Sequence, residues 1–185
     1  MGYKLIDVNG NEISLHNLQD KGVWCKAGAS KEEGFVGLYG KKLNLKINPE
    51  KENDPYAPDL VNTRNGLLAD LKIQNTPFFQ AKARFGLDPQ YTVVFNKKDK
   101  LRYKAKYPDI EIYFAVDWQA IKFVSAKTIE VLPMVGVWFI PFGKLDVLLK
   151  SAPLHEYVQR MGDTQGNARE SYVLDLKNSA FKKAV

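Results

Sequence analysis

The sequence predicts a mixed α/β (α+β) protein of one domain, and three observations support this. The chain has 185 residues, of which 45% are hydrophobic and 26% charged, as in an ordinary globular protein with a full core. Apolar residues alternate along several short segments, which is typical of half-buried β-strands. Helix start and stop signals stand between these segments. We therefore expect a single domain over residues 1–185.

The first part of the chain predicts a β-hairpin, a helix and a strand. Asn-Gly at 9–10 lies between two apolar runs and favours a hairpin turn. In "SKEEGFVGLYG", Ser30 suits the N-cap, Glu33 the capping-box position and Gly40 the helix end. The repeated glycines of this helix indicate close packing or an irregular helix, because the P-loop ending is absent. The alternating apolar residues of 43–47 then predict a strand.

A second hairpin is predicted for "APDLVNTRNGLLADLKIQ". The Asn-Gly pair at 65–66 stands between two apolar runs and favours a type I′ turn. With this pair at the centre of the turn, Leu60 faces Leu71 and Asp59 faces Lys72.

Alternation of side chains along a strand places four polar groups on one face of this hairpin: Asp59, Asp70, Lys72 and Gln74. The diagonal separation of the two aspartates is about 7–8 Å, so their oxygens can share one hard divalent cation. An Asp-Lys pair across strands is most often a surface salt bridge. Here the apolar residues on both sides of the strand favour a functional role, because buried charge is costly.

The remaining elements follow in order. They are a helix from Thr76 (N-cap) and Pro77 to Gly86, a strand over 91–95, a basic helix from Asn96 to before Pro108, a strand over 109–118, further strand over 127–140, helix in one or two pieces over 143–162, and a last strand over 171–176. We expect the phenylalanines of 78–85 and the aromatic residues Trp118, Trp138, Phe139 and Phe142 to lie in the core or an interface.

The charge distribution favours an anionic partner. Net charge is +6, and most of the excess lies in "NKKDKLRYKAK". Such a run is commonly a solvated helix face. If the partner is a nucleic acid, the candidates for phosphate contact are Lys97, Lys98, Lys100, Arg102 and Lys104, with Lys82 and Arg84 on the preceding helix.

Several kinds of site are disfavoured by composition. Cys25 is the only cysteine, so the chain can form no internal disulfide and no CxxC zinc site. His16 and His155 have no spaced partners, which argues against a histidine metal site or a Ser/His/Asp triad. The chain shows neither a signal peptide nor an apolar run long enough to span a bilayer, so we expect a cytoplasmic protein with no membrane partner.

The "PD" at 58–59, the "DLK" at 70–72 and the order of elements around them resemble the PD-(D/E)xK nuclease superfamily. The resemblance covers about residues 28–118, with 119–185 as a C-terminal β/α extension of the same domain. It implies a restriction-endonuclease-like core, in which a central mixed sheet is flanked by helices. It also implies an order of acid-bearing helix, hairpin, helix, strand, basic helix and strand.

The resemblance further implies a magnesium- or manganese-dependent nuclease that hydrolyses DNA phosphodiester bonds. Asp59 and Asp70 would bind Mg²⁺ (or Mn²⁺), with the carbonyl of Leu71 completing the coordination. Lys72 would position or deprotonate the attacking water, or stabilise charge on the phosphate. Gln74 resembles the polar residue that contacts water or backbone two positions after the lysine. The preceding helix usually adds an acid, and both Glu32 and Glu33 qualify.

Other functions stay open at this point. The main alternative is a nucleic-acid-binding or assembly protein on the same fold with weak or lost catalysis. The third is a structural module with surface ion pairs. DNA is favoured over RNA as partner and an endonuclease over an exonuclease. The apolar strand "VGVWFI" makes a homodimer plausible.

Overall fold

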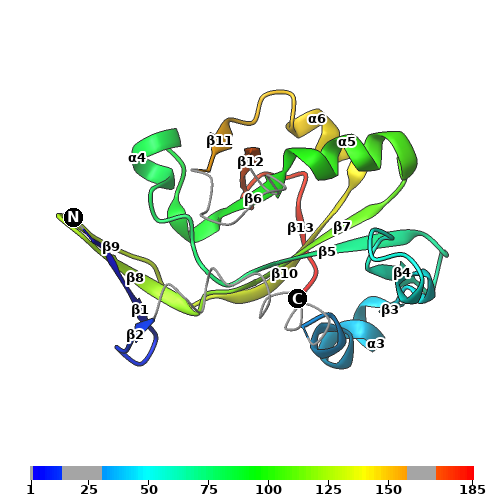
Figure 1. Cartoon of the computed structure of the whole chain (residues 1–185), viewed down its shortest axis with the longest axis horizontal. Helices are drawn as coiled ribbons and strands as arrows, with labels where there is room; N and C mark the ends of the chain where they lie inside the picture. Colours follow the sequence, from blue (N-terminus) through cyan, green and yellow to red (C-terminus); the bar gives the residue numbers. More distant parts are fainter. Residues whose placement is uncertain (1, 14–30, 158–169) are drawn as a thin grey trace.

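The computed structural model describes residues 2–13, 31–157 and 170–185. The predicted N-cap Ser30, Cys25, His16 and the end of the helix predicted over 143–162 lie outside these ranges. Within them the protein is mixed α+β, with three sheets and few, short helices (Figure 1). No helix of the described ranges is long and apolar enough to cross a membrane.

A six-stranded sheet forms the centre of the molecule. Its order is β13-β10-β7-β5-β4-β3, where the strands are β3 (Leu45–Ile47), β4 (Leu60–Asn62), β5 (Leu68–Gln74), β7 (Glu111–Asp117), β10 (Val135–Pro141) and β13 (Lys182–Lys183). Strands β5 and β7 pair in parallel, and the other neighbours pair antiparallel. The sheet is therefore mixed, as predicted.

Two smaller sheets flank it. One has the order β2-β1-β8-β9, from β1 (Lys4–Asp7), β2 (Glu12–Ile13), β8 (Ala120–Val124) and β9 (Thr128–Glu130). The other has the order β11-β12-β6, from β6 (Thr92–Asn96), β11 (Leu154–Glu156) and β12 (Glu170–Asp175). The predicted hairpin at 9–10 is confirmed by the pairing of β1 with β2, and Gly10 has the positive φ of 84° that its turn requires.

The first described helix does not end at Gly40, which corrects the prediction. Helical residues 31–35 continue through a wide turn, η1 (Val36–Gly40), into α3 (Lys41–Leu43). Asn44 ends the helix in the left-handed region, with a φ of 57°. Gly40 is needed for another reason, because a Cβ there would lie 2.7 Å from the carbonyl oxygen of Leu45. Of the two alternatives predicted from the glycines, the irregular helix is confirmed, and close packing is found at Gly40 but not at Gly34 or Gly37.

The other described helices are α4 (Ala81–Phe85), α5 (Lys97–Lys106) and α6 (Phe142–Leu148), with 3-10 turns η2 (Pro49–Glu52) and η3 (Pro89–Tyr91). Helix α5 begins as predicted, with the Asn96 side chain accepting the N–H of Lys98. Helix α4 begins at Ala81 rather than at Pro77, and it ends at Gly86 as predicted. His155 lies in strand β11 rather than in a helix, because β11 pairs with β12.

The hairpin of β4 and β5 differs from the predicted register by two residues. Leu60 pairs with Ala69 instead of Leu71, and the turn is longer than the predicted type I′ turn. Asn62 donates its N–H to the carbonyl of Leu67 and accepts the N–H of Gly66, so four residues form the loop. Only Gly66 has a positive φ in this loop. A shift of two residues leaves every side chain on its predicted face.

Two apolar layers cover the two faces of the central sheet. On one face, Leu60, Ala69, Leu71 and the helical Phe35 are buried together. On the other, the sheet packs beneath α5, α6 and the strands β6 and β12 (Figure 1). That layer contains Phe95 and Tyr103 together with Trp118, Trp138 and Phe142, and the predicted core position of the last three is confirmed. Asp70 and Lys72 project toward this second layer, against α5.

Candidate active site

The hairpin brings Asp59 and Asp70 together. Asp59 immediately precedes β4, and extending the observed register by one residue places it opposite Asp70 rather than Lys72. The Oδ2 of Asp59 accepts the backbone N–H of Leu71 at 3.0 Å, while its own carbonyl accepts the N–H of Asn48 at 3.0 Å. Asp70 is only 2% exposed. Backbone contacts therefore fix the Asp59 carboxylate at the edge where β4 begins, next to the buried Asp70.

Lys51 is a member of the site that the sequence did not reveal. It stands in the 3-10 turn η2, which Asn48 caps by accepting the N–H of Glu50. Its Nζ forms an ion pair with Oδ1 of Asp59 and lies 3.5 Å from Oε1 of Glu32. The buried Asn48 also donates its side-chain amide to the carbonyl of Pro58 at 2.9 Å. One asparagine thus positions both the turn of Lys51 and the segment of Asp59.

Glu32, and not Glu33, lies beside the aspartates. Glu33 is exposed, whereas Glu32 faces Lys51. Burial and the neighbouring charge of Asp59 raise the pKa of Glu32 from 4.5 to about 7, although Lys51 opposes the shift. Burial and the charge of Asp70 likewise raise the pKa of Asp59. Both shifts indicate a place where negative charge is crowded.

Lys72 is enclosed by acceptors. Its Nζ lies 2.6 Å from Oδ2 of Asp70, 2.6 Å from Oδ2 of Asp99 and 3.3 Å from the hydroxyl of Tyr103. The contact with Asp70 is a short ion pair to a carboxylate oxygen that is buried from solvent. Burial disfavours the ammonium, but Asp70, Tyr103 and Asp99 together raise the pKa of Lys72 well above its ordinary value. Lys72 is therefore charged at neutral pH.

Arg102 adds a third cation to the site. Its guanidinium lies 3.1 Å from Asp99, 3.8 Å from Asp70 and 2.8 Å from the hydroxyl of Tyr103, to which it donates. Its planar group also lies over the Tyr103 ring, 4.8 Å from the centroid. Arg102, which was predicted to contact phosphate, thus lies within the acidic cluster.

Gln74 shares the face of Asp70 and Lys72 but binds backbone. Its side chain donates to the carbonyl of Val94 at 2.8 Å and accepts the N–H of Val94 at 3.1 Å. These two bonds join β5 of the central sheet to β6 of the neighbouring one. The side-chain amide is fully engaged in that link.

The cluster carries an excess of negative charge. Four carboxylates (Glu32, Asp59, Asp70 and Asp99) face three cationic groups (Lys51, Lys72 and Arg102). One negative charge is left unbalanced when all are ionised, in a largely buried place. A divalent cation would relieve this charge, and the carboxylate oxygens of Asp59 and Asp70 are ligands of the kind that Mg²⁺ takes.

The donor set suits a cation held through two carboxylates. Within the described ranges, no three Asp, Glu, His or Cys side chains already surround one point, and Lys51 stands between Glu32 and Asp59. Mg²⁺ is commonly bound by one or two carboxylates, with water and substrate oxygens as the remaining ligands. The carbonyl of Leu71 adds a further oxygen, because the N–H and C=O of a strand residue face the same side and its N–H faces Asp59. The residues therefore fit Mg²⁺ or Mn²⁺.

Most of the predicted phosphate-binding residues make internal contacts. Lys97 pairs with Glu170 at 2.8 Å, Lys100 lies 3.6 Å and Lys104 3.4 Å from Asp146. Lys98 also has an interaction within the protein. On α4, Lys82 donates to the carbonyl of Gly86, and Arg84 contacts Gln80 and the His155 ring. Figure 1 places α4 apart from α5, with β6 between them.

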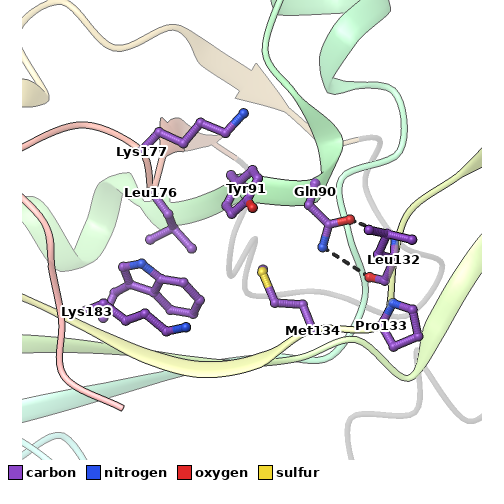
Figure 2. A pocket seen from close by; sticks show the side chains of 9 residues that line it. Gln90, Tyr91, Leu132, Pro133, Met134, Leu176, Lys177 and Lys183 are labelled. Atoms are coloured by element: carbon purple, nitrogen blue, oxygen red, sulfur yellow. Dashed lines mark hydrogen bonds between the residues drawn. The ribbon is translucent and has the colours of Figure 1, made fainter.

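A separate cavity of about 500 Å³ lies away from the acidic cluster (Figure 2). It is lined by Gln90, Tyr91, Leu132, Pro133, Met134, Trp138, Leu176, Lys177 and Lys183. The side-chain amide of Gln90 forms two hydrogen bonds with the backbone of Leu132, and Lys177 pairs with Asp88. None of the residues predicted for the site lines this cavity.

Comparison of the chain with known proteins finds no matching family model, no matching curated protein and no matching solved structure.

Proposed function

We propose that this protein is a metal-dependent nuclease of the PD-(D/E)xK type that hydrolyses DNA phosphodiester bonds. The observation that carries the proposal is the largely buried carboxylate pair Asp59 and Asp70, which lies in a cluster with one more carboxylate than cations and has Lys72 held as an ammonium beside it. A surface ion pair would not need such burial, because charge taken out of water is costly without a purpose.

Asp59, Asp70 and the carbonyl of Leu71 would hold Mg²⁺ or Mn²⁺, and Glu32 is the acid of the preceding helix nearest to them. The bound ion would supply a water that is deprotonated near neutral pH and a positive charge against the phosphate. In this arrangement Asp59 and Asp70 orient the ion, while the N–H of Leu71 orients Asp59.

Lys72 would act as a cation rather than as a base. Because its raised pKa keeps it protonated, it cannot remove a proton from water at neutral pH. Its charge can stabilise the negative charge that develops on the phosphate and can position the attacking water. Gln74 would contribute only by holding β5 against β6.

The order of elements supports a restriction-endonuclease-like core. Helical residues 31–35 carry Glu32, and they are followed by the hairpin, α4, β6, α5 and β7. This is the order that the resemblance implies, and β7 returns in parallel beside the lysine-bearing β5. The strand β10 of the C-terminal extension pairs with β7.

DNA is the proposed partner, with RNA as a further possibility to be tested. The net charge of +6 favours a polyanion, and Lys104 and Lys97 keep exposed side chains on α5 next to the cluster. An endonuclease acting in the cytoplasm, as a monomer or a homodimer, is the form that we propose.

One observation favours the rival function, a nucleic-acid-binding or assembly protein without catalysis. Lys51 and Lys72 already pair with Asp59 and Asp70, so the carboxylates of such a protein could be permanently satisfied by lysines. Metal binding separates the two functions, because the rival predicts none at Asp70.

The test is cleavage of supercoiled plasmid and labelled linear DNA and RNA with Mg²⁺, Mn²⁺ or EDTA. Asp70→Asn and Lys72→Met proteins would be compared with the wild type and with Glu130→Gln, a matched control on the exposed strand β9. Metal-dependent cutting that is lost in the first two variants and kept in the control supports the proposal. Equal cutting by all four proteins would identify a contaminant. Mn²⁺ binding measured by calorimetry would accompany each assay.

A further inference from the structure

The ammonium of Lys72 has a second acidic partner, which comes from α5. Asp99 Oδ2 lies 2.6 Å from Nζ, the same distance as Asp70 Oδ2. The hydroxyl of Tyr103, one turn further along the helix, is the third neighbour at 3.3 Å. The three N–H groups of the ammonium thus have three oxygen neighbours, two of them from one helix.

Asp99 is itself held in place. It stands in the first turn of α5, just after the Asn96 cap, and its Oδ1 forms an ion pair with the guanidinium of Arg102 at 3.1 Å. Tyr103 is fully buried, and its hydroxyl receives a hydrogen bond from Arg102 at 2.8 Å. One carboxylate oxygen therefore faces Lys72 while the other faces Arg102.

Helix α5 is anchored by contacts that do not involve the site. Lys97 pairs with Glu170 of β12, and Lys100 and Lys104 lie beside Asp146 of α6. The rings of Phe95 and Tyr103 stand 5.9 Å and 5.7 Å from the ammonium and form an apolar wall. The position of Asp99 relative to Lys72 is thus set by the packing of the helix.

This arrangement reduces the competition between Lys72 and a metal ion for the carboxylate of Asp70. If Asp70 were the only counter-ion of Lys72, a cation bound at Asp70 would meet an uncompensated ammonium at close range. A second carboxylate, on a different element, compensates Lys72 without occupying the hairpin. Arg102 lies 3.1 Å from the other oxygen of Asp99 and so fixes the orientation of this carboxylate toward Lys72.

We propose that Asp99 is the positioning residue of Lys72, giving the ammonium a fixed counter-ion that leaves Asp70 available for a divalent cation. Its catalytic meaning rests on the proposed nuclease function. The placement of Lys72 by Asp99 is a property of the folded protein and can be tested without activity.

The experiment follows the NH₃⁺ group of Lys72 by ¹H–¹⁵N correlation spectroscopy of the metal-free protein at low temperature. A hydrogen-bonded, buried ammonium gives a sharp signal, because its protons exchange slowly with water. Lys72→Met identifies the signal by its disappearance. We expect Asp99→Asn to shift or broaden this signal and Asp99→Glu to restore it in part.

Asp146→Asn is the matched control, since it removes a carboxylate that also pairs with lysines of α5 but does not contact Lys72. It should leave the signal unchanged. An Asp99→Asn protein that folds and keeps the wild-type signal would overturn the proposal. So would an equal change in the Asp146→Asn protein, which would assign the effect to a general loosening of α5.

Two further measurements connect the placement to function. Asp99→Asn should weaken Mn²⁺ binding by about tenfold, because Lys72 then competes fully for Asp70. It should lower kcat for DNA cleavage by about 100-fold with little change in KM, since the lysine is displaced rather than the DNA surface. If no protein of the series cleaves DNA while the Lys72 signal responds as expected, the nuclease function fails and the positioning role stands.

Discussion

Lys51 forms an ion pair with Asp59, eight residues further along the chain, and this pair neutralises one carboxylate of the hairpin. The lysine comes from a 3-10 turn capped by Asn48, which also bonds the backbone of Pro58 and Asp59, so one residue sets both partners of the pair. The ammonium of Lys51 thus lies between Asp59 and Glu32, the acid that would otherwise be the third carboxylate ligand of the metal.

Replacing Lys51 by methionine should tighten Mn²⁺ binding by about tenfold, because a unit positive charge near the cation is removed. Isothermal titration calorimetry of the metal would measure it. Lys51→Arg keeps the charge and should bind like the wild type, and Lys46→Met removes an exposed lysine of β3 as a matched control. Unchanged affinity in the Lys51→Met protein would place the cation elsewhere.

The stability of the metal-free protein should fall as pH rises from about 5 to about 7. The folded-state pKa of Glu32 is about 7, against an ordinary value of 4.5, so between these values the folded protein holds a proton that the unfolded chain has lost. The stabilisation is complete below the unfolded pKa and is lost as pH passes the folded pKa. The raised pKa of Asp59 acts in the same direction.

The expected decrease is on the order of 2 kcal/mol, reduced from the full shift because Glu32 is partly exposed. Urea unfolding in EDTA at four pH values between 5 and 8 would measure it. Glu32→Gln cannot ionise and should flatten the profile in this range, whereas Glu33→Gln should leave the slope as it is. A wild-type protein that gains stability over the same interval would contradict the prediction.

The buried Glu111 should be important for the hairpin loop. It accepts hydrogen bonds from the amide of Asn62 at 3.0 Å, the amide of Asn65 at 3.2 Å and the hydroxyl of Tyr113 at 3.2 Å. Glu111→Leu leaves these donors without a partner and should lower the free energy of unfolding by about 2–3 kcal/mol. Asn65→Ala removes its bond to Glu111 and the exposed bond in which its Oδ1 accepts the N–H of Leu67, and should cost about 1 kcal/mol by urea unfolding. Equal costs would mean that the loop alone is affected.

Gln74→Leu should destabilise the protein by about 1–2 kcal/mol, because both hydrogen bonds to the backbone of Val94 are lost. Gln74→Glu keeps the acceptor and should lose only part of this stability. Denaturant unfolding gives both values, and cleavage at saturating metal gives the functional comparison. A large loss of kcat with unchanged stability would show that Gln74 acts in the chemistry instead.

The faces of the hairpin could be predicted from the sequence, but its register could not. Alternation of polar and apolar residues places Asp59, Asp70 and Lys72 on one side of the hairpin, and a register shift by an even number of residues does not change this. The type I′ preference of Asn65-Gly66 was overridden by Asn62, whose backbone closes a four-residue loop and whose side chain reaches Glu111. Glu111 lies 49 residues further along the chain, so no local sequence pattern predicts this contact.

Lys51 and Asp99 were missed for related reasons. Asp99 stands among six basic residues and reads as a helix-surface charge, and its spacing of three from Arg102 was the available signal. Lys51 lies in a polar segment, where "NPE" with Asn48 as cap was the only sign of an ordered turn. Their roles depend on which elements meet in space, and this is a tertiary property.

The parallel pairing of β5 with β7 has a consequence for how the protein folds. Strands β3, β4 and β5 form a meander of short-range contacts, whereas β5 and β7 can meet only after the crossover over 75–110 has closed. Because α5 lies within that crossover, Lys72 gains its helix partners in the same late event. We expect pulse-labelling hydrogen exchange to show amides of the β4–β5 hairpin protected before those of β7. The carboxylate pair of the newly formed hairpin would then be exposed to water and free cations before α5 packs against Lys72.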